Sequence, residues 1–147
     1  MYYRFFGQRN PEKDIERILV DLLGTGGVST RIRFYTFTIE DVLTVNTGKI
    51  RLYNRTGDTL TILEVFAAVN TASSGANIIL DINQNGTSIW NATPANRVTI
   101  TAGANTGSQT AFDTSQWTNG NYLTLDVDQR GSLGTEGYNL TVMVKVL

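Results

Sequence analysis

The sequence predicts an all-β fold: an antiparallel β-sandwich, jelly-roll-like, preceded by a short N-terminal α-helical arm. Three observations support this prediction. Short apolar-alternating segments fill most of the chain, clusters of Gly, Asn, Asp and Ser separate them, and the one amphipathic helix pattern lies near the start. Because the composition changes at the glycines between residues 24 and 27, we expect an arm at residues 1–27 and a sandwich domain at residues 28–147.

The predicted helix begins at Asn10-Pro11 and ends at Gly24. Asn is a good N-cap, Pro is favoured at the first helical position, and Gly is favoured just after the last turn. Between them, apolar residues recur with the spacing of one helix face, at Ile15, Ile18, Leu19, Leu22 and Leu23.

After Val28 the pattern becomes that of strands separated by turns. The predicted strands are 33–38, 49–53, 59–69, 77–83, 87–90, 97–101, 122–129 and 138–147. Asn85-Gly86 predicts a hairpin with a type I′ turn, since both residues accept positive φ. Residues 102–118 are polar and contain glycine, so we expect a long loop there, anchored by Phe112 and Trp117.

Composition excludes several kinds of site. The 147-residue chain has no Cys and no His, which removes disulfides, thiolate and imidazole metal sites, and the usual general base near neutral pH. The net charge is −1 with no basic stripe, so we expect no nucleic-acid partner. No segment approaches the roughly 20 apolar residues of a membrane span, and we expect neither a membrane partner nor a cofactor.

Carboxylates supply the only candidate chemistry. Asp81-x-Asn83-x-Asn85-Gly86 matches the opening of a calcium-binding loop, but its twelfth position is Ala92 and no helices flank it, which favours a hairpin. Asp81, Asp126 and Asp128 would converge if their strands were neighbours. They could then hold a cation or act as acid and base, although solvated strand faces are the commoner explanation.

The apolar stripe of the arm must be buried somewhere. It could fold against its own sandwich, or it could dock onto a neighbouring protein. Four aromatic residues in the first six positions have the composition of an interface core. The predicted partner interface is Tyr2, Tyr3, Phe5, Phe6, Ile15, Ile18, Leu19, Leu22 and Leu23.

The part of the chain from Gly48 onward resembles a family of small β-sandwich domains found in surface proteins of tailed-bacteriophage virions. The resembling segments are 50–57, 59–62, 80–90, 95–103, 122–129 and 140–144, whereas residues 1–47 lie outside the resemblance. The resemblance implies a structural protein on the particle surface, such as a capsid decoration protein or a tail-fibre-type protein. It implies no catalytic residues.

We therefore expect a capsid decoration (cement) protein that docks through its arm, with the major capsid protein as partner, and exposes its sandwich. The alternative is a tail-tip or fibre-head module that binds host cell-surface glycan, with Trp90, Trp117 and Tyr138 as stacking residues. A glycan hydrolase would need two carboxylates at a defined separation, and since no motif supports it we expect no enzyme.

The sequence also predicts a homotrimer, in which several arms or low-charge, Thr-rich sheet faces meet and cover the apolar stripe. Three weak arms engaging together would also hold firmly to a particle. Replacing Leu19 with Asp places a charge on the stripe, so assembly should weaken while strand content is kept. Light scattering and circular dichroism measure the two quantities. A chain that is monomeric both at high concentration and on the particle would contradict the trimer.

Overall fold

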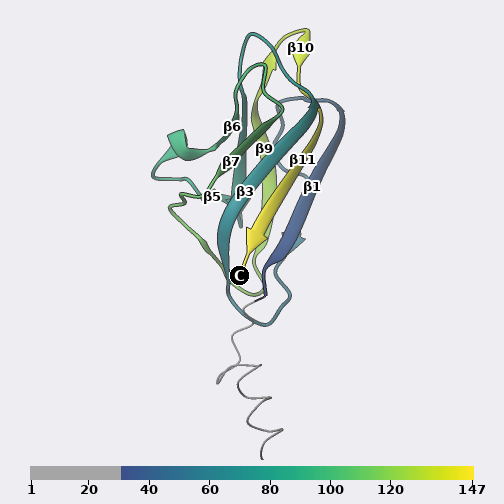
Figure 1. Ribbon diagram of the computed structural model, residues 1–147. Helices are drawn as coiled ribbons and strands as arrows, with labels where there is room; N and C mark the ends of the chain where they lie inside the picture. The colour runs from purple at the N-terminus through teal and green to yellow at the C-terminus, as the bar shows by residue number, and fades with distance from the viewer. Residues whose placement is uncertain (1–30) are drawn as a thin grey trace, which may run out of the picture. The chain divides into compact units, whose positions relative to one another are not determined.

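The computed structural model of the chain describes residues 31–147, and two antiparallel β-sheets make up most of this part (Figure 1). The predicted helix, the docking arm and the boundary at residue 27 all fall on residues 1–30, so they lie outside the described residues. Within residues 31–147 no helix is long and apolar enough to cross a membrane.

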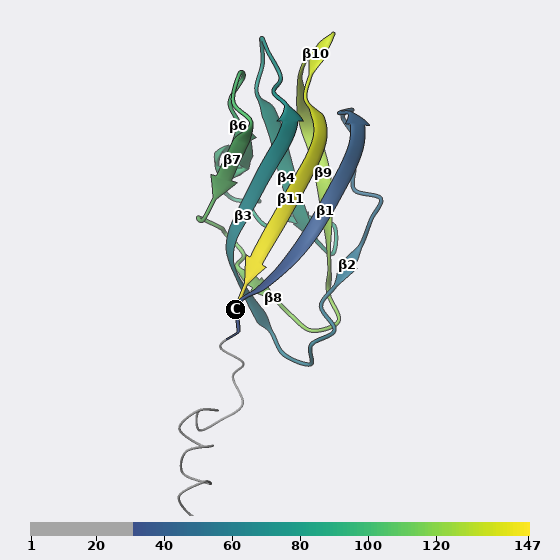
Figure 2. The same ribbon diagram turned by 45° about the vertical axis from the view of Figure 1, so that its right-hand side comes forward.

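The first sheet has the strand order β1-β11-β3-β7, and a short strand, β8, pairs with the beginning of β3. Figure 2 shows β3, β11 and β1 side by side at the front of the domain. The strands are β1 (Arg33–Val42), β3 (Leu60–Thr71), β7 (Thr106–Gln109), β8 (Gln116–Trp117) and β11 (Tyr138–Val146).

The second sheet has the order β10-β9-β4-β5, with β2 also paired to β9 and β6 also paired to β4. Its strands are β2 (Leu52–Tyr53), β4 (Ile78–Gln84), β5 (Thr87–Ser88), β6 (Val98–Ile100), β9 (Tyr122–Ser132) and β10 (Thr135–Glu136). A short 3₁₀ helix, η1 (Pro94–Asn96), precedes β6.

The strand order is that of a jelly roll. Eight strands carry the pattern, namely β1, β2, β3, β4, β6, β7, β9 and β11. Counted along the chain, the first, eighth, third and sixth of them form one sheet, and the second, seventh, fourth and fifth form the other. The all-β antiparallel fold predicted from the sequence is therefore confirmed.

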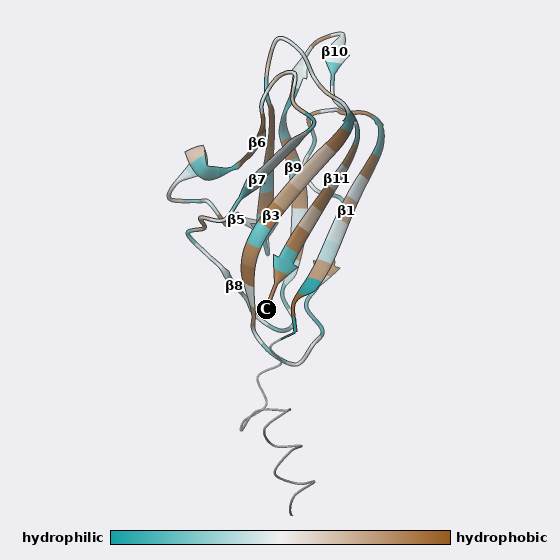
Figure 3. Cartoon of the chain, in the orientation of Figure 1, coloured by the Kyte–Doolittle hydropathy of each residue, from teal (hydrophilic) through white to brown (hydrophobic). Residues whose placement is uncertain are grey.

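Alternation along the strands directs one apolar face of each sheet inward. Opposite residues are both buried in pairs such as Val65 with Val144 on the first sheet and Ile82 with Leu125 on the second. Hydrophobic segments run along β3 and β11 in Figure 3. Trp90 and Trp117 are fully buried in the same core.

The loops gather at the two ends of the strands. At one end, here called the Ser73 end, the loops after β3, β6 and β9 are joined by the bonds from Gly103 N–H to Ser73 O (2.8 Å) and from Ser74 N–H to Thr135 O (3.0 Å). The tight turn between β9 and β10 also lies there; its Leu133 is 84% exposed, and Gly134 adopts a φ of 82°.

The other end, the Asn54 end, is organised around one buried side chain. The Asn54 amide donates to the carbonyl oxygens of Asp58 (2.8 Å) and Trp117 (2.7 Å), and its oxygen accepts from the backbone and hydroxyl of Thr56. β1 starts and β11 finishes at this end, since Arg33 pairs with Val146.

Most local predictions agree with the structure. All eight predicted strands are present with shifted ends, and Asn85 and Gly86 both have positive φ, as a type I′ turn requires. The loop predicted at residues 102–118 was wrong in part, because it contains β7 and β8. These strands are short and polar, so they lack the apolar alternation that marks a strand in a sequence.

Replacing Asn54 with Ala should reduce the free energy of unfolding by about 2 kcal/mol, because the buried carbonyl group of Trp117 and the part-buried carbonyl group of Asp58 lose their donor. Urea denaturation measures this. Asn119→Ala is the control: Asn119 is exposed and accepts one bond from Gly57 N–H, so its loss should cost less than about 1 kcal/mol. Equal losses would contradict the anchoring role of Asn54.

Candidate functional site

The three aspartates singled out by the sequence lie on one outer face of the second sheet. Asp81 of β4 stands directly opposite Asp126 of β9, and Asp128 follows two residues later on the same strand. β4 and β9 are hydrogen-bonded neighbours, so the expected convergence occurs.

An arginine that the sequence analysis did not include lies among these carboxylates. Arg97, just before β6, places Nε 2.9 Å from Asp81 Oδ2 and a terminal nitrogen 3.1 Å from Asp128 Oδ2. The Nε contact is an ion pair whose geometry falls outside that of a hydrogen bond. Arg97 was missed because it lies near Asp81 only when β6 pairs with β4 in the folded sheet, and no local sequence pattern predicts that pairing.

Two further hydrogen bonds reach the carboxylates of the cluster. Ser88 on β5 donates to Asp81 Oδ1 at 2.7 Å, and the backbone N–H of Gly48 donates to Asp126 Oδ1. Gly48 lies so close to β9 that a Cβ there would be 2.6 Å from Thr124 Cβ, hence a side chain would push this segment away.

Burial dominates the electrostatics of Asp81, whose side chain is 6% exposed. It raises the pKa of the Asp81 carboxyl above its ordinary value, against the opposing effects of the Ser88 hydrogen bond and the Arg97 charge. No group of three or more acidic residues within residues 31–147 is arranged to hold a metal ion. The arrangement is a cluster of three carboxylates, two of them paired with Arg97, and it ties β4, β6 and β9 together.

The segment that resembles a calcium loop is a β-hairpin. Asn83 pairs with Ser88 across it, and Asn85 occupies the turn, where its side-chain oxygen accepts from Tyr122 N–H at 3.1 Å. Residues 81–84 belong to β4, so the segment lacks the loop and flanking helices of such a site. The sequence's preference for a hairpin is confirmed.

The aromatic residues proposed for glycan stacking need correction. Trp90 and Trp117 are both 0% exposed; their indole N–H groups donate to Ala111 O (2.7 Å) and Asn121 O (3.1 Å). They cannot stack on a ligand in this structure. Tyr138 is at the surface, where its hydroxyl donates to Asp41 at 2.8 Å. The tryptophans were misjudged because each lies beside a polar turn but packs inward.

A different pair of aromatic residues is available on the outer face of the second sheet. Tyr53 and Tyr122 are paired across β2 and β9 with ring centroids 5.5 Å apart, and the Arg51 guanidinium lies 4.5 Å from the Tyr122 ring centroid. Tyr122 alternates with buried Leu123, a signal in the sequence that could have placed it outward.

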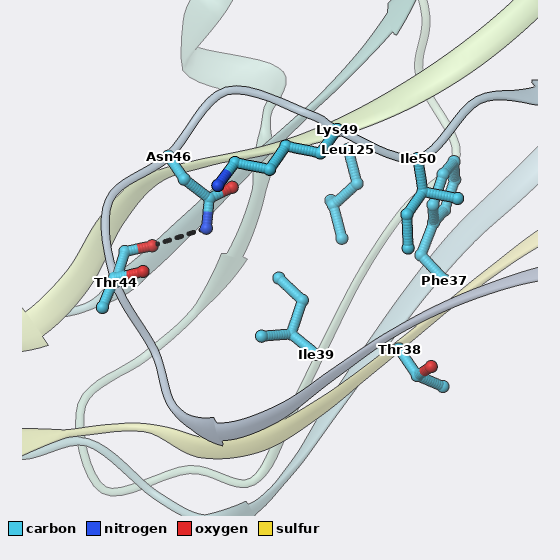
Figure 4. Close-up of a pocket in the computed structure, with 8 residues that line it drawn as sticks. All are labelled: Phe37, Thr38, Ile39, Thr44, Asn46, Lys49, Ile50 and Leu125. Atoms are coloured by element: carbon cyan, nitrogen blue, oxygen red, sulfur yellow. Dashed lines mark hydrogen bonds between the residues drawn. The ribbon is translucent and has the colours of Figure 1, made fainter.

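The side of the sandwich bounded by β1 and β2 is open and apolar. A cavity of about 230 Å³ lies between β1 and the segment that connects it to β2. In Figure 4, Phe37 and Ile39 of β1, Leu125 of β9 and Ile50 of the connecting segment border the same space. Lys49 and Asn46 form its polar border.

The residues predicted to form the partner interface are Tyr2, Tyr3, Phe5, Phe6, Ile15, Ile18, Leu19, Leu22 and Leu23. All of them fall on residues 1–30, outside the described part of the chain, so their role stays a prediction.

No protein-family model and no curated protein matches the chain. Among solved structures, the one described as "Capsid of Ralstonia phage GP4" contains a chain that is similar over 84% of this chain and 88% of that chain, with a TM-score of 0.50 and 14% sequence identity. Likeness at that identity shows the fold alone. Membership in a family of phage virion surface proteins, of decoration or tail-fibre type, stays a prediction.

Replacing Asp81 with Asn should change the pH dependence of stability. The folded state binds the Asp81 proton more tightly than the unfolded chain, so this group's contribution to stability is present below pH 3.8 and is lost as pH rises through the raised pKa. The free energy of unfolding of the unmodified chain, minus that of Asp81→Asn, should therefore fall with rising pH across this window.

Urea denaturation at a series of pH values measures this difference. Asp58→Asn, at an exposed turn position, is the control for a general effect of removing one carboxylate. A difference that rises with pH would mean that the Arg97 ion pair outweighs the burial of Asp81.

Proposed function

We propose that this chain is a structural protein of a bacteriophage particle, and specifically a capsid decoration (cement) protein. The observation that supports this is the jelly roll shared, over most of both chains, with a chain of the phage capsid structure. A fold shared at 14% identity is compatible with other functions, so the proposal needs a test on particles.

The two ends of the sandwich suit this role. The described part of the chain begins at the Asn54 end, where β1 starts, so the preceding residues are linked to the domain at this end. The Ser73 end lies at the opposite ends of the strands and carries the compact loops and the β9–β10 turn. We propose that the arm docks on the major capsid protein and that the Ser73 end faces the surroundings of the particle.

The aspartate cluster, with Asp81 and Asp128 paired to Arg97, supports a structural role. A general acid or base must be free to exchange a proton with a substrate, whereas Asp81 is buried and held by Arg97 and Ser88. We propose that the protein is not an enzyme. A polysaccharide-degrading activity that disappears in Asp128→Asn would contradict this.

The alternative, a tail-tip or fibre-head module that binds host glycan, is favoured by one observation. Exposed Tyr53 and Arg51, together with half-buried Tyr122, form an aromatic and cationic group of the kind that sugars and other planar ligands contact. If this group binds glycan, Tyr53→Ala should abolish attachment of the purified protein to host cells. A decoration protein would tolerate the same change.

Deleting residues 1–24 should leave a folded β-domain that no longer joins the particle, because the docking residues are removed and the core of residues 31–147 is kept. Circular dichroism checks the fold, and co-sedimentation with particles that lack the protein checks binding. An unfolded product would mean that the arm belongs to the sandwich core.

Densitometry of purified particles distinguishes the decoration protein from the fibre-head module. A decoration protein should be present at a copy number comparable to that of the major capsid protein, whereas a fibre-head module should be far scarcer. A low copy number would contradict the cement proposal.

A further inference from the structure

We propose that the outer edge of β1 pairs antiparallel with the same edge of a second copy of this chain, so that the first sheets of two copies join about a two-fold axis. This inference concerns contact between copies and does not depend on the proposed function.

Within residues 31–147, no other strand pairs with the outer edge of β1. β1 is the terminal strand of the first sheet and has ten residues, whereas the other strands at sheet edges in residues 31–147 have two to four. An unpaired edge offers a row of backbone N–H and C=O groups to another strand, and proteins that avoid such pairing shorten the edge or place Lys or Pro on it.

The centre of β1 carries none of these protective features. Residues 34–39 are Phe-Tyr-Thr-Phe-Thr-Ile, without charge, Pro or Gly, and all of these residue types favour strands. A sequence of this kind on a free edge is expected to associate with another strand. The edge therefore has the properties of a strand that pairs with another strand.

Exposed apolar residues gather around the same edge. Of the nine large exposed hydrophobic residues in residues 31–147, five lie on β1 or the segments that flank it: Ile32, Phe34, Val42, Val45 and Ile50. The cavity between β1 and the connecting segment opens beside them (Figure 4). A strand added to β1 would bring its own side chains against these residues and bury them.

The charges at the two ends of β1 point to a second copy as the partner. Arg31 lies just before its beginning, and Glu40 and Asp41 lie at its end. Two identical strands related by a two-fold axis run antiparallel, which brings the basic end of each beside the acidic end of the other. The β1 edges of two copies therefore match each other in charge as well as in backbone hydrogen bonding.

The symmetry of this contact differs from that of the trimer predicted from the sequence. Edge pairing about a two-fold axis joins two copies, so it would produce a dimer or connect copies that belong to different trimers. A test that reports proximity at the edge itself identifies the contact in either case.

The absence of cysteine allows such a test on the full chain. Thr36 is exposed at the centre of β1, so Thr36→Cys places one thiol close to its symmetry mate. Opposite and diagonal positions across an antiparallel pair lie about 5–8 Å apart, within reach of a short bis-maleimide. Ser108→Cys, exposed on β7 at the opposite edge of the same sheet, is the matched control.

We expect a covalent dimer from Thr36→Cys and at least a tenfold lower yield from Ser108→Cys. Glu40→Lys, added to Thr36→Cys, should lower the dimer yield several-fold because like charges then meet at each end of the contact. Asp58→Lys, at an exposed turn position outside β1, should leave the yield unchanged.

Three results would overturn the proposal. The first is equal cross-linking at residues 36 and 108. The second is the absence of a cross-linked dimer from Thr36→Cys at any concentration, although a maleimide with a single reactive group labels the thiol. The third is a thiol at residue 36 that resists labelling because the edge of β1 is already covered. Circular dichroism of each variant confirms that the strand content is unchanged.

Discussion

The apolar layer between the two sheets is the constraint on which the rest of the domain depends. β3 and β11 are central in one sheet and β4 and β9 in the other, and each pair joins segments far apart in the sequence. Closing such long connections costs conformational entropy, and burial of the inward residues offsets that cost. Without this layer, neither the aspartate cluster nor the Asn54 loop anchor would have strands to hold it.

Elements whose residue pattern lies within their own segment were predicted from the sequence, and elements that depend on distant residues were not. β4 and β9 alternate apolar and polar residues within their own segments, and Asn85-Gly86 specifies its turn without outside help. β7 consists of Thr, Gly, Ser and Gln, and it is a strand only because β3 lies beside it. Arg97 reaches Asp81 and Asp128 through tertiary pairing, so no local pattern indicated these two ion pairs.

The tryptophans show that the direction of a side chain is equally hard to predict from the local sequence. A Trp beside polar turn residues is compatible with a surface stacking group or with a plug that closes the core. For Trp117 the decision rests on Tyr35, whose ring meets it edge-on at 4.8 Å, and on the carbonyl of Asn121 that accepts its N–H. Both partners come from other strands or loops. Residue type alone therefore identified an aromatic of interest but not the direction in which it faces.

The two long sides of the sandwich are unequal. On the β6–β7 side the backbones approach so closely that a Cβ on Gly107 would lie 2.2 Å from Thr99 O, which closes that side without side chains. On the β1–β2 side, apolar residues remain at the surface beside a cavity.

The β9–β10 turn, finally, bears on how this protein can change over time. Leu133 and Gly134 form a two-residue connection with an almost fully exposed side chain, and the backbone bonds that secure the Ser73 end come from the residues on either side of it. Insertions at such tips disturb neither core packing nor sheet register. New peptide sequence could accumulate there, giving lineages different outer surfaces on an unchanged scaffold, and a foreign epitope could be displayed at the same position.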